Sequence, residues 1–449
     1  MGCQKPKPEE IHATRTGHSL VLFFLVLLLY NANLRPLSSG DCVPNRLLPI
    51  SIVSEFDLNL DEFEFPADGS LDYVLIRSKG HIYSVYPPTL PVIISPLYVP
   101  VVYYLHSIGG TLSPSRLRDV TWEIAKVMEK LSSSLIASLS VLFLYLALLE
   151  ICRRRTALWL TLLYAVGTST WAIGSQALWQ HGLSELSLCL MVYGFLKSRY
   201  NDRWLALAGL AAGLAVATRV SNFLFALTGL IYVWQRRRSA VPVYMGFPAI
   251  AAALIVAYNV YSFGNVTGYY GKVGSFDVFR DLFLNTNVAG LAGLLLSPSR
   301  GWLIYSPFAV FSIIGALLLW RSENIPILKY MTIPFAGHIA FYSSFKMWWG
   351  GHCYGPRYLT DVAPFLCLFL VPILPLLKRK GIREIFAIAA LFSVFVQVVG
   401  AFYYPAGLWD ALPTNVDKHP ERVWDWRDTQ ILRSLRCGPA SIKLPSALK

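Results

Sequence analysis

The chain has 449 residues, of which 55% are hydrophobic and only 14% are charged, and its mean hydropathy is +0.49. This balance excludes one large soluble domain and is typical of a multispanning membrane protein. The net charge of +13 does not indicate nucleic-acid binding, because the basic residues stand in short clusters between apolar runs, where topology signals belong.

Apolar runs of about 20 residues recur along the chain, and each is long enough to cross a hydrocarbon layer of roughly 30 Å as a helix. Placing the basic clusters between them in the cytoplasm gives one consistent alternation of about eleven transmembrane helices. We predict these helices at 18–35, 132–151, 156–177, 181–198, 203–218, 221–236, 240–262, 302–320, 326–345, 359–377 and 383–403. The sequence therefore predicts an all-α polytopic membrane protein.

This topology divides the chain into four parts. The N-terminal run "LVLFFLVLLLY" lacks a small-residue cleavage site, so we expect a cytoplasmic N-terminus and an uncleaved first span over 1–35. An outer loop follows over 36–131. The transmembrane core covers 132–403 and includes outer loops at 263–301 and 346–358. The tail over 404–449 lies on the outer face.

Part of the first outer loop, "YPPTLPVIISPLYVPVVYYL", is too apolar for a free linker. Its prolines argue against a straight span, so we expect short helices lying in the membrane interface.

Any reaction must use the outer loops, packed on helix ends. The predicted cytoplasmic loops are a few residues each and contain no Gly-rich phosphate loop. Nucleotide sugars are not normally available outside the cell. An external transferase would therefore need a donor that crosses the membrane as a lipid conjugate.

Eight carboxylates stand between Asp41 and Asp72, and most of them are typical of a solvated loop. Asp41 differs because it lies soon after the first span, in "LSSGDCVPNRLLP", within reach of Arg46. A carboxylate fixed at the membrane surface is suited to act as general base for a hydroxyl acceptor. Asp61 is the second candidate.

Three further polar residues stand near predicted outer helix ends. Tyr86 in "VYPPTLP" belongs either to a turn or to a binding site. His181 in "ALWQHGLSE" is either a structural interface residue or a ligand for a phosphate or a sugar hydroxyl. Arg219 either extends to the headgroups or faces a cavity, because a charge costs about 2.5–3.5 kcal/mol at a helix centre.

Two segments combine basic residues with irregular backbone. Arg300 in "SPSRGWLIYSP", together with Lys272 in "GYYGKVG", indicates a place to hold an anion, because irregular backbone at membrane depth persists only against protein or a water-filled cavity.

The segment "WWGGHCYGPRYLTD" adds Trp348, Trp349, Tyr354 and Arg357. It is either an aromatic belt with a turn, or a site in which rings stack on a sugar and Arg357 binds a phosphate through two hydrogen bonds.

The cysteines show no metal-binding spacing, and a divalent metal has no support from His, Asp or Glu spacing either. Cys42, Cys353 and Cys437 would face an oxidising compartment in this topology. They form either one disulfide with a free thiol or three free thiols.

Five blocks occur in an order that resembles bacterial GT-C membrane glycosyltransferases: "SGDCVPNRLLP", "YPPTLPVIISPLY", "GTSTWAIGSQALWQHG", "LSPSRGWLIYSP" and "WWGGHCYGPRYLTD". The nearest broad relatives are protein O-mannosyltransferases and lipid A aminoarabinose transferases. The resemblance implies an outer-face enzyme of the bacterial cytoplasmic membrane that uses a polyprenyl-phosphate sugar and a glycan, lipid or protein acceptor.

The resemblance also implies roles for particular residues. Asp41 would be the base, and Arg357, Arg300 and Arg219 would stabilise the leaving phosphate. Many relatives carry two adjacent acids at the base position, whereas this chain has Gly40-Asp41-Cys42, which gives no support for a paired-acid mechanism or a bound divalent metal.

A secondary transporter or lipid flippase is the alternative function. The short spans and Arg219 fit it, but the informative residues gather on one face and no internal repeat is visible.

Overall fold

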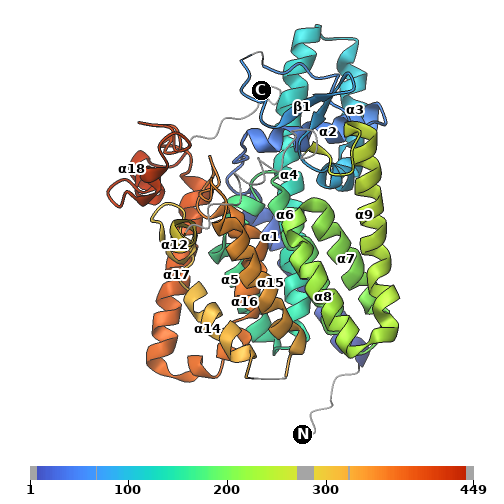
Figure 1. Cartoon of the computed structure of the whole chain (residues 1–449). Coiled ribbons are helices and arrows are strands. Elements are labelled where there is room, and N and C mark those ends of the chain that lie inside the picture. The colour runs from blue at the N-terminus through green and yellow to red at the C-terminus, as the bar shows by residue number, and fades with distance from the viewer. Residues whose placement is uncertain (1–7, 67, 270–287, 322–323, 441–449) are drawn as a thin grey trace.

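The computed structural model describes residues 8–66, 68–269, 288–321 and 324–440. Most of them form helices that lie side by side in a bundle (Figure 1). The main bundle helices are α1 (Pro8–Asn31), α4 (Pro114–Leu149), α5 (Arg154–Gly167), α6 (Gln180–Lys197), α7 (Trp204–Thr218), α8 (Phe223–Arg236), α9 (Val241–Phe263), α14 (Ala309–Leu319), α15 (Pro326–Ser343) and α17 (Lys380–Phe402).

Smaller elements gather at the end of the bundle away from the N-terminus (Figure 1). They include α2 (Val43–Ser54), α3 (Thr89–Gly109), α12 (Val288–Leu296), α18 (Gln430–Cys437) and the antiparallel hairpin of β1 (Leu75–Ser78) and β2 (His81–Ser84), in which Leu75 pairs with Ser84. We call this end the outer end. The hairpin is the only departure from the all-α prediction among the described residues.

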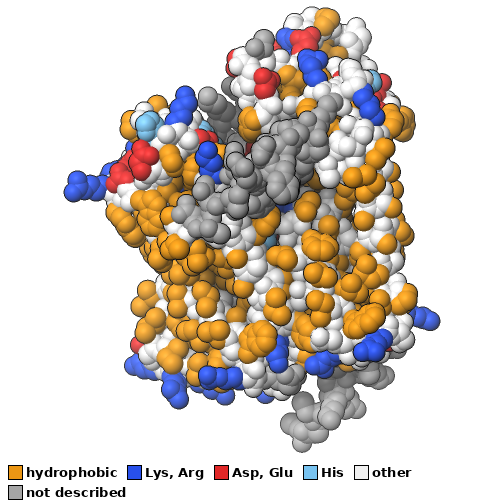
Figure 2. Space-filling view, in the orientation of Figure 1, with side chains coloured by type: hydrophobic (Ala, Val, Ile, Leu, Met, Phe, Trp, Pro, Cys, Tyr) orange, Lys and Arg blue, Asp and Glu red, His pale blue; other side chains and the backbone are white. Residues whose placement is uncertain are grey.

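Four helices in the described part of the chain are long and apolar enough to cross a membrane: α3, α4, α9 with the turn before it, and α17. Apolar side chains cover the middle of the molecule, and Lys and Arg side chains line the edge near the N-terminus (Figure 2). The basic clusters Arg153–Arg155 and Lys378–Lys380 are exposed. These features fit a polytopic membrane protein, and the count of eleven spans stays a prediction.

The prediction of short helices for the segment "YPPTLPVIISPLYVPVVYYL" was wrong. Residues Thr89–Gly109 form one helix, α3, of 21 residues, with Pro96 and Pro100 inside it. Pro96 has no N–H to donate to the carbonyl of Val92, four residues earlier. The hydroxyl of Ser95 donates to that carbonyl instead, at 2.8 Å. This side-chain hydrogen bond takes the place of the backbone hydrogen bond that Pro96 cannot form.

The predicted span at 359–377 is not one helix. It consists of α16 (Ala363–Leu368) between 3₁₀ turns at Arg357–Val362, Val371–Ile373 and Leu376–Lys378. Prolines at 364, 372 and 375 account for the interruptions. Every side chain from Leu359 to Leu370 is buried, so this broken segment runs through the centre of the bundle.

Close packing of the helices depends on small residues. A Cβ atom on Gly194 of α6 would lie 2.8 Å from the backbone nitrogen of Ala208 in α7. A Cβ on Gly209 would lie 2.0 Å from the carbonyl oxygen of Tyr244 in α9. Small residues at such positions let helix backbones approach closely, which is typical of helix packing in membranes. The bundle therefore fixes the positions of the outer helix ends, where the candidate site lies.

Candidate functional site at the outer helix ends

Asp41 and Arg357 form an ion pair at the outer end of the bundle. Asp41 lies in a 3₁₀ turn (Gly40–Cys42) between α1 and α2, and the Ser39 hydroxyl accepts a hydrogen bond from its backbone N–H. Arg357 begins the 3₁₀ turn before α16 and donates from Nη1 to Asp41 Oδ2 at 2.6 Å. The side chains of Asp41 and Arg357 are 16% and 12% exposed, so the pair is largely shielded from water.

Aromatic rings surround this pair. The guanidinium carbon of Arg357 lies 4.5 Å from the centre of the Trp179 ring and 5.3 Å from that of Tyr358. These cation–π contacts hold the guanidinium plane in place. Its Nε is buried and has no hydrogen-bond partner in the described part of the chain. Arg357 therefore keeps one unused donor beside Asp41.

Two tyrosine hydroxyls lie beside Asp41. A Cβ atom on Gly40 would lie 2.1 Å from the Tyr73 hydroxyl, so the close approach of Tyr73 requires glycine. Burial raises the pKa of the Tyr73 and Tyr86 phenols above the ordinary value for tyrosine, and the charge of Asp41 raises it further. Both phenols therefore remain neutral hydrogen-bond donors.

A second charged cluster centres on Asp361, which is fully buried. Its Oδ1 lies 2.9 Å from His181 Nδ1, and its Oδ2 lies 2.9 Å from Arg219 Nε and 3.7 Å from His338 Nε2. Arg219 Nη2 also donates to the Tyr342 hydroxyl. Arg219 Nε is buried beside Asp361 but forms no hydrogen bond in the described part of the chain.

The Asp41 and Asp361 clusters are linked by stacked rings. The Tyr358 ring, which contacts Arg357, stacks on Tyr342 at 4.6 Å between centres with planes 12° apart. Tyr342 in turn contacts the Arg219 guanidinium at 5.6 Å. On another side, Trp179 lies between Arg357 and His181. The structure thus brings Asp41, Tyr86, His181, Arg219 and Arg357 into one region.

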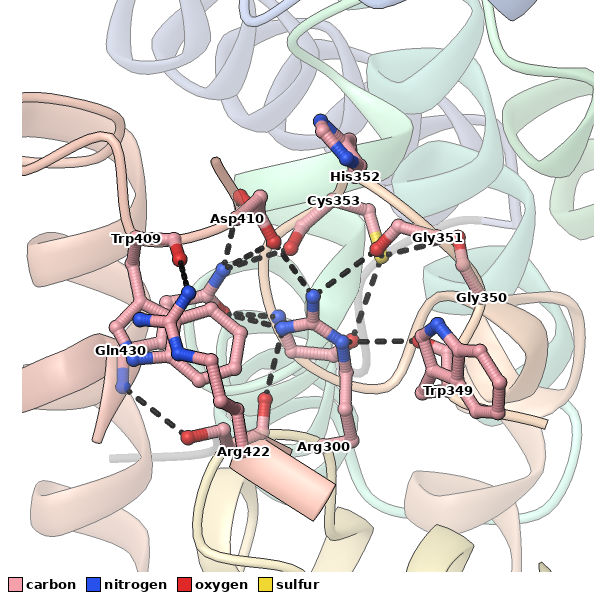
Figure 3. A network of polar contacts seen from close by, with 12 residues as sticks. Arg300, Trp349, Gly350, Gly351, His352, Cys353, Trp409, Asp410, Arg422 and Gln430 are labelled. Atoms are coloured by element: carbon pink, nitrogen blue, oxygen red, sulfur yellow. Dashed lines mark hydrogen bonds and ion pairs between the residues drawn. The ribbon is translucent and has the colours of Figure 1, made fainter. Parts of the chain in front are cut away.

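Arg300 lies in a separate network of polar contacts (Figure 3). Its side chain is fully buried. Its five N–H groups all donate within the protein at 2.6–3.0 Å: Nε to the Trp349 carbonyl, Nη1 to the Ser299 carbonyl and Gln430 Oε1, and Nη2 to the Gly351 carbonyl and Asp410 Oδ1. Gly350, Gly351 and Gly355 have positive φ, which lets the loop turn around the guanidinium. Arg300 therefore has no N–H group left to bind an anion. Its contacts hold the loop that ends at Arg357.

The aromatic residues of the same loop also face the protein. Trp349 donates from Nε1 to Asp417 at 2.9 Å, and Trp348 packs against Trp424 in the tail. The Tyr354 hydroxyl donates to the Val396 carbonyl of α17 at 2.8 Å. All three rings are less than a tenth exposed, so none presents a free face for a sugar.

Arg46 and Asp61 have protein partners as well. Arg46 pairs with buried Glu129 at 3.0 Å, and its guanidinium lies over Trp122. Asp61 contacts His81 at 2.5 Å and accepts from the backbone of β2, so it stabilises the hairpin. Neither residue contacts the Asp41–Arg357 pair.

Three remaining predictions concern an anion, a disulfide and a metal. Lys272 lies outside the described residues. Cys42, Cys353 and Cys437 are unpaired, and the first two are buried. In the described part of the chain, no group of three His, Cys, Asp or Glu side chains could hold a metal ion. The immediate partner of Asp41 is a guanidinium, so the residues present do not fit a metal site there.

Sequence reasoning missed Asp361 and Glu129. Asp361 is the last residue of the segment "WWGGHCYGPRYLTD", directly before an apolar run, and an acid in that context was an overlooked signal. Glu129 stands beside Lys130 in a polar stretch, so nothing in the neighbouring sequence indicates that it pairs with Arg46.

No protein-family model and no curated protein sequence matches the chain. Among solved structures, it resembles the Archaeoglobus fulgidus oligosaccharyltransferase in the apo form, at 12% identity and a TM-score of 0.49 over 95% of this chain and 61% of that one. For the same enzyme tethered to an acceptor peptide, the sequence identity is 14% and the TM-score is 0.45, over 92% of this chain and 59% of that one.

A third structure is the A. fulgidus oligosaccharyltransferase AglB in complex with an inhibitory peptide and a dolichol-phosphate. Its sequence identity to this chain is 13% and the TM-score is 0.46, over 96% of this chain and 62% of that one. The chain thus spans about three-fifths of the length of these enzymes. Because every TM-score lies below one half, these similarities carry no conclusion about fold or activity.

Proposed function

We propose that the chain is a membrane glycosyltransferase of the GT-C type. It transfers a sugar from a polyprenyl-phosphate donor to a hydroxyl acceptor at the outer face of the bacterial cytoplasmic membrane. The observation that carries this proposal is the contact of Asp41 with Arg357 at the outer end of the bundle. A general base and a phosphate-binding group lie there within reach of one lipid-linked substrate.

Arg357 is the group that meets the donor phosphate. Its Nε has no hydrogen-bond partner among the described residues, and its planar guanidinium can form two parallel hydrogen bonds with a phosphate. A bound phosphate competes with Asp41 for Arg357 and so releases the carboxylate. Substrate binding thereby creates a free base only when the donor is in place.

The transfer is a single in-line displacement. Asp41 takes the proton of the acceptor hydroxyl while the acceptor oxygen forms a bond to the anomeric carbon of the sugar. The bond from that carbon to the phosphate oxygen breaks, and the polyprenyl phosphate leaves with the electron pair. Arg357 and Arg219 offset the negative charge that develops on the leaving oxygen.

Asp361 positions two groups for this step. Its contacts with Arg219 Nε and His181 Nδ1 fix the orientation of the guanidinium and of the imidazole ring. With Nδ1 directed at the carboxylate, His181 presents Nε2 as the second ring nitrogen for a substrate hydroxyl. Tyr73 and Tyr86 supply neutral hydroxyl donors beside Asp41.

The experiment that tests this proposal compares surface glycans by mass spectrometry with and without the gene. We expect the deletion to remove one sugar modification and the wild-type gene to restore it. Asp41→Asn should be present in the membrane at normal levels yet restore nothing, whereas the matched control Asp72→Asn, at an exposed position of the same loop, should restore it fully. Restoration by Asp41→Asn would rule out the assignment of the base.

Reconstitution into vesicles distinguishes a glycosyltransferase from a transporter or flippase. Purified protein in vesicles, given a polyprenyl-phosphate sugar and an acceptor extract, should release polyprenyl phosphate. Flux of the lipid across the bilayer without any release would assign transport instead.

A further inference from the structure

A second group of basic side chains lies just beyond the outer end of α1, beside the middle of α4. Lys130 of α4 is 6% exposed, and its recorded partner is Gln176 Oε1 at 2.5 Å. Arg35, just after α1, is partly buried and donates only to the backbone carbonyls of Tyr404 and Ala401, at 2.7 and 3.4 Å. The proposed transfer step uses neither cation.

Asn33 joins these two cations. Its Nδ2 donates to Gln176 Oε1 at 2.6 Å, the oxygen that Lys130 also contacts, and to the Ala401 carbonyl at 2.8 Å, the oxygen that Arg35 also contacts. Asn33 is 4% exposed, and its Oδ1 is buried without a hydrogen-bond partner. Two basic side chains and one unused acceptor therefore lie around the same amide.

Among the described residues, no carboxylate forms an ion pair with Lys130 or Arg35. The neighbouring acid in the sequence, Glu129, is already paired with Arg46. A buried ammonium without a counter-charge is costly, and polar groups at membrane depth usually mark a ligand or a pathway. A neutral Lys130 that serves only to hold Gln176 is the structural alternative.

We propose that Lys130, Arg35 and Asn33 form a binding site for a phosphate monoester. Its anionic oxygens accept from Lys130 and Arg35, and its P–OH group, present in the monoanion, donates to Asn33 Oδ1. A phosphodiester lacks that hydroxyl, so the unused acceptor favours a monoester.

The site lies close in the chain to the candidate base. The Leu37 N–H donates to the Gln176 carbonyl at 2.9 Å, which ties the segment before Asp41 to this group. Resting on the proposed function, the natural occupant is the polyprenyl phosphate released by transfer, which is a phosphate monoester. Phosphatidic acid headgroups and inorganic phosphate share the same chemistry, and the experiment separates these sources.

The test uses the full chain in lipid nanodiscs and farnesyl phosphate as the probe. Binding is followed by intrinsic tryptophan fluorescence. We expect Lys130→Met to weaken binding by about tenfold or more, the loss of one charge-assisted contact. Lys126→Met, an exposed lysine one turn earlier on α4, is the matched control and should change the dissociation constant less than about twofold.

Arg35→Gln is a second variant, in case Lys130→Met does not fold, and it should also weaken binding. Uncharged farnesol should not compete for the site. Competition by inorganic phosphate would show that the headgroup alone suffices, and competition by phosphatidic acid but not phosphatidylcholine in the nanodisc would assign a bilayer lipid as occupant.

Equal affinity in Lys130→Met and Lys126→Met, or a more stable Lys130→Met with unchanged binding, would overturn the proposal and leave Lys130 a structural residue. Binding of farnesyl phosphate by a wild-type chain that transfers no sugar would defeat the proposed function and leave this site standing.

Discussion

Replacing Asp361 by asparagine tests how the buried charges are held. The substitution keeps the shape of the side chain but removes its charge. Arg219, whose side chain is 14% exposed, then loses its only carboxylate partner among the described residues. The asparagine side chain would still offer an oxygen to His181 Nδ1, so the main loss is electrostatic.

The magnitude follows from the distance. With charge centres about 4 Å apart and an effective dielectric constant of about 20, the attraction is about 4 kcal/mol. The 2.9 Å contact between Arg219 Nε and Asp361 Oδ2 does not have the alignment of a hydrogen bond, so it is mainly an ion pair. Breaking one partner of a buried pair costs about 3–5 kcal/mol. We expect Asp361→Asn to lower the free energy of unfolding by this amount.

The assay is urea or dodecyl sulfate unfolding of the purified chain in micelles, followed by tryptophan fluorescence. The double variant Asp361→Asn/Arg219→Met removes both charges, so it should recover to within about 2 kcal/mol of wild type. A loss below about 1 kcal/mol in the single variant, or strictly additive losses in the double variant, would refute the view of Asp361 as the counter-charge of Arg219.

Two other variants separate catalysis from scaffolding. Arg357→Lys keeps a cation but loses the planar group that lies on Trp179, so we expect kcat of sugar transfer to fall about 10–100-fold; unchanged kcat would remove Arg357 from phosphate recognition. Arg300→Lys reduces five donors to three, so we expect about 2–4 kcal/mol less stability in the same unfolding titration. Transfer per folded Arg300→Lys molecule should stay close to wild type, and a selective loss of transfer would return Arg300 to the reaction.

Helix positions were largely predictable from the sequence. The apolar run expected at 203–218 became α7 at Trp204–Thr218, and the run at 240–262 became α9 at Val241–Phe263. Apolar composition and basic flanks are local properties of a chain, so they can be read without knowing the fold. The prolines in Thr89–Gly109 predicted short helices, whereas the structure has one helix there. The Ser95 hydroxyl donates to the carbonyl that Pro96 leaves without its usual donor, so the helix continues.

The candidate site was predictable only in part. Asp41 stood out because it follows the first span, and Arg357 because it lies among glycines and aromatic residues. From the sequence, Arg300 and Arg219 were equivalent candidates for an anion. Only the structure distinguishes them, since all five N–H groups of Arg300 donate within the protein, whereas Arg219 Nε forms no hydrogen bond in the described part of the chain.

The sequence by itself determined that apolar helices form, where most of them begin and end, and where the basic clusters lie between them. The tertiary structure decided which charged groups meet. Arg357 contacts a residue 316 positions away, and Arg300 one 110 positions away. The reason is physical: hydrophobic patterning acts between neighbours along the chain, whereas an ion pair depends on distance in space, which exists only once the helices have packed.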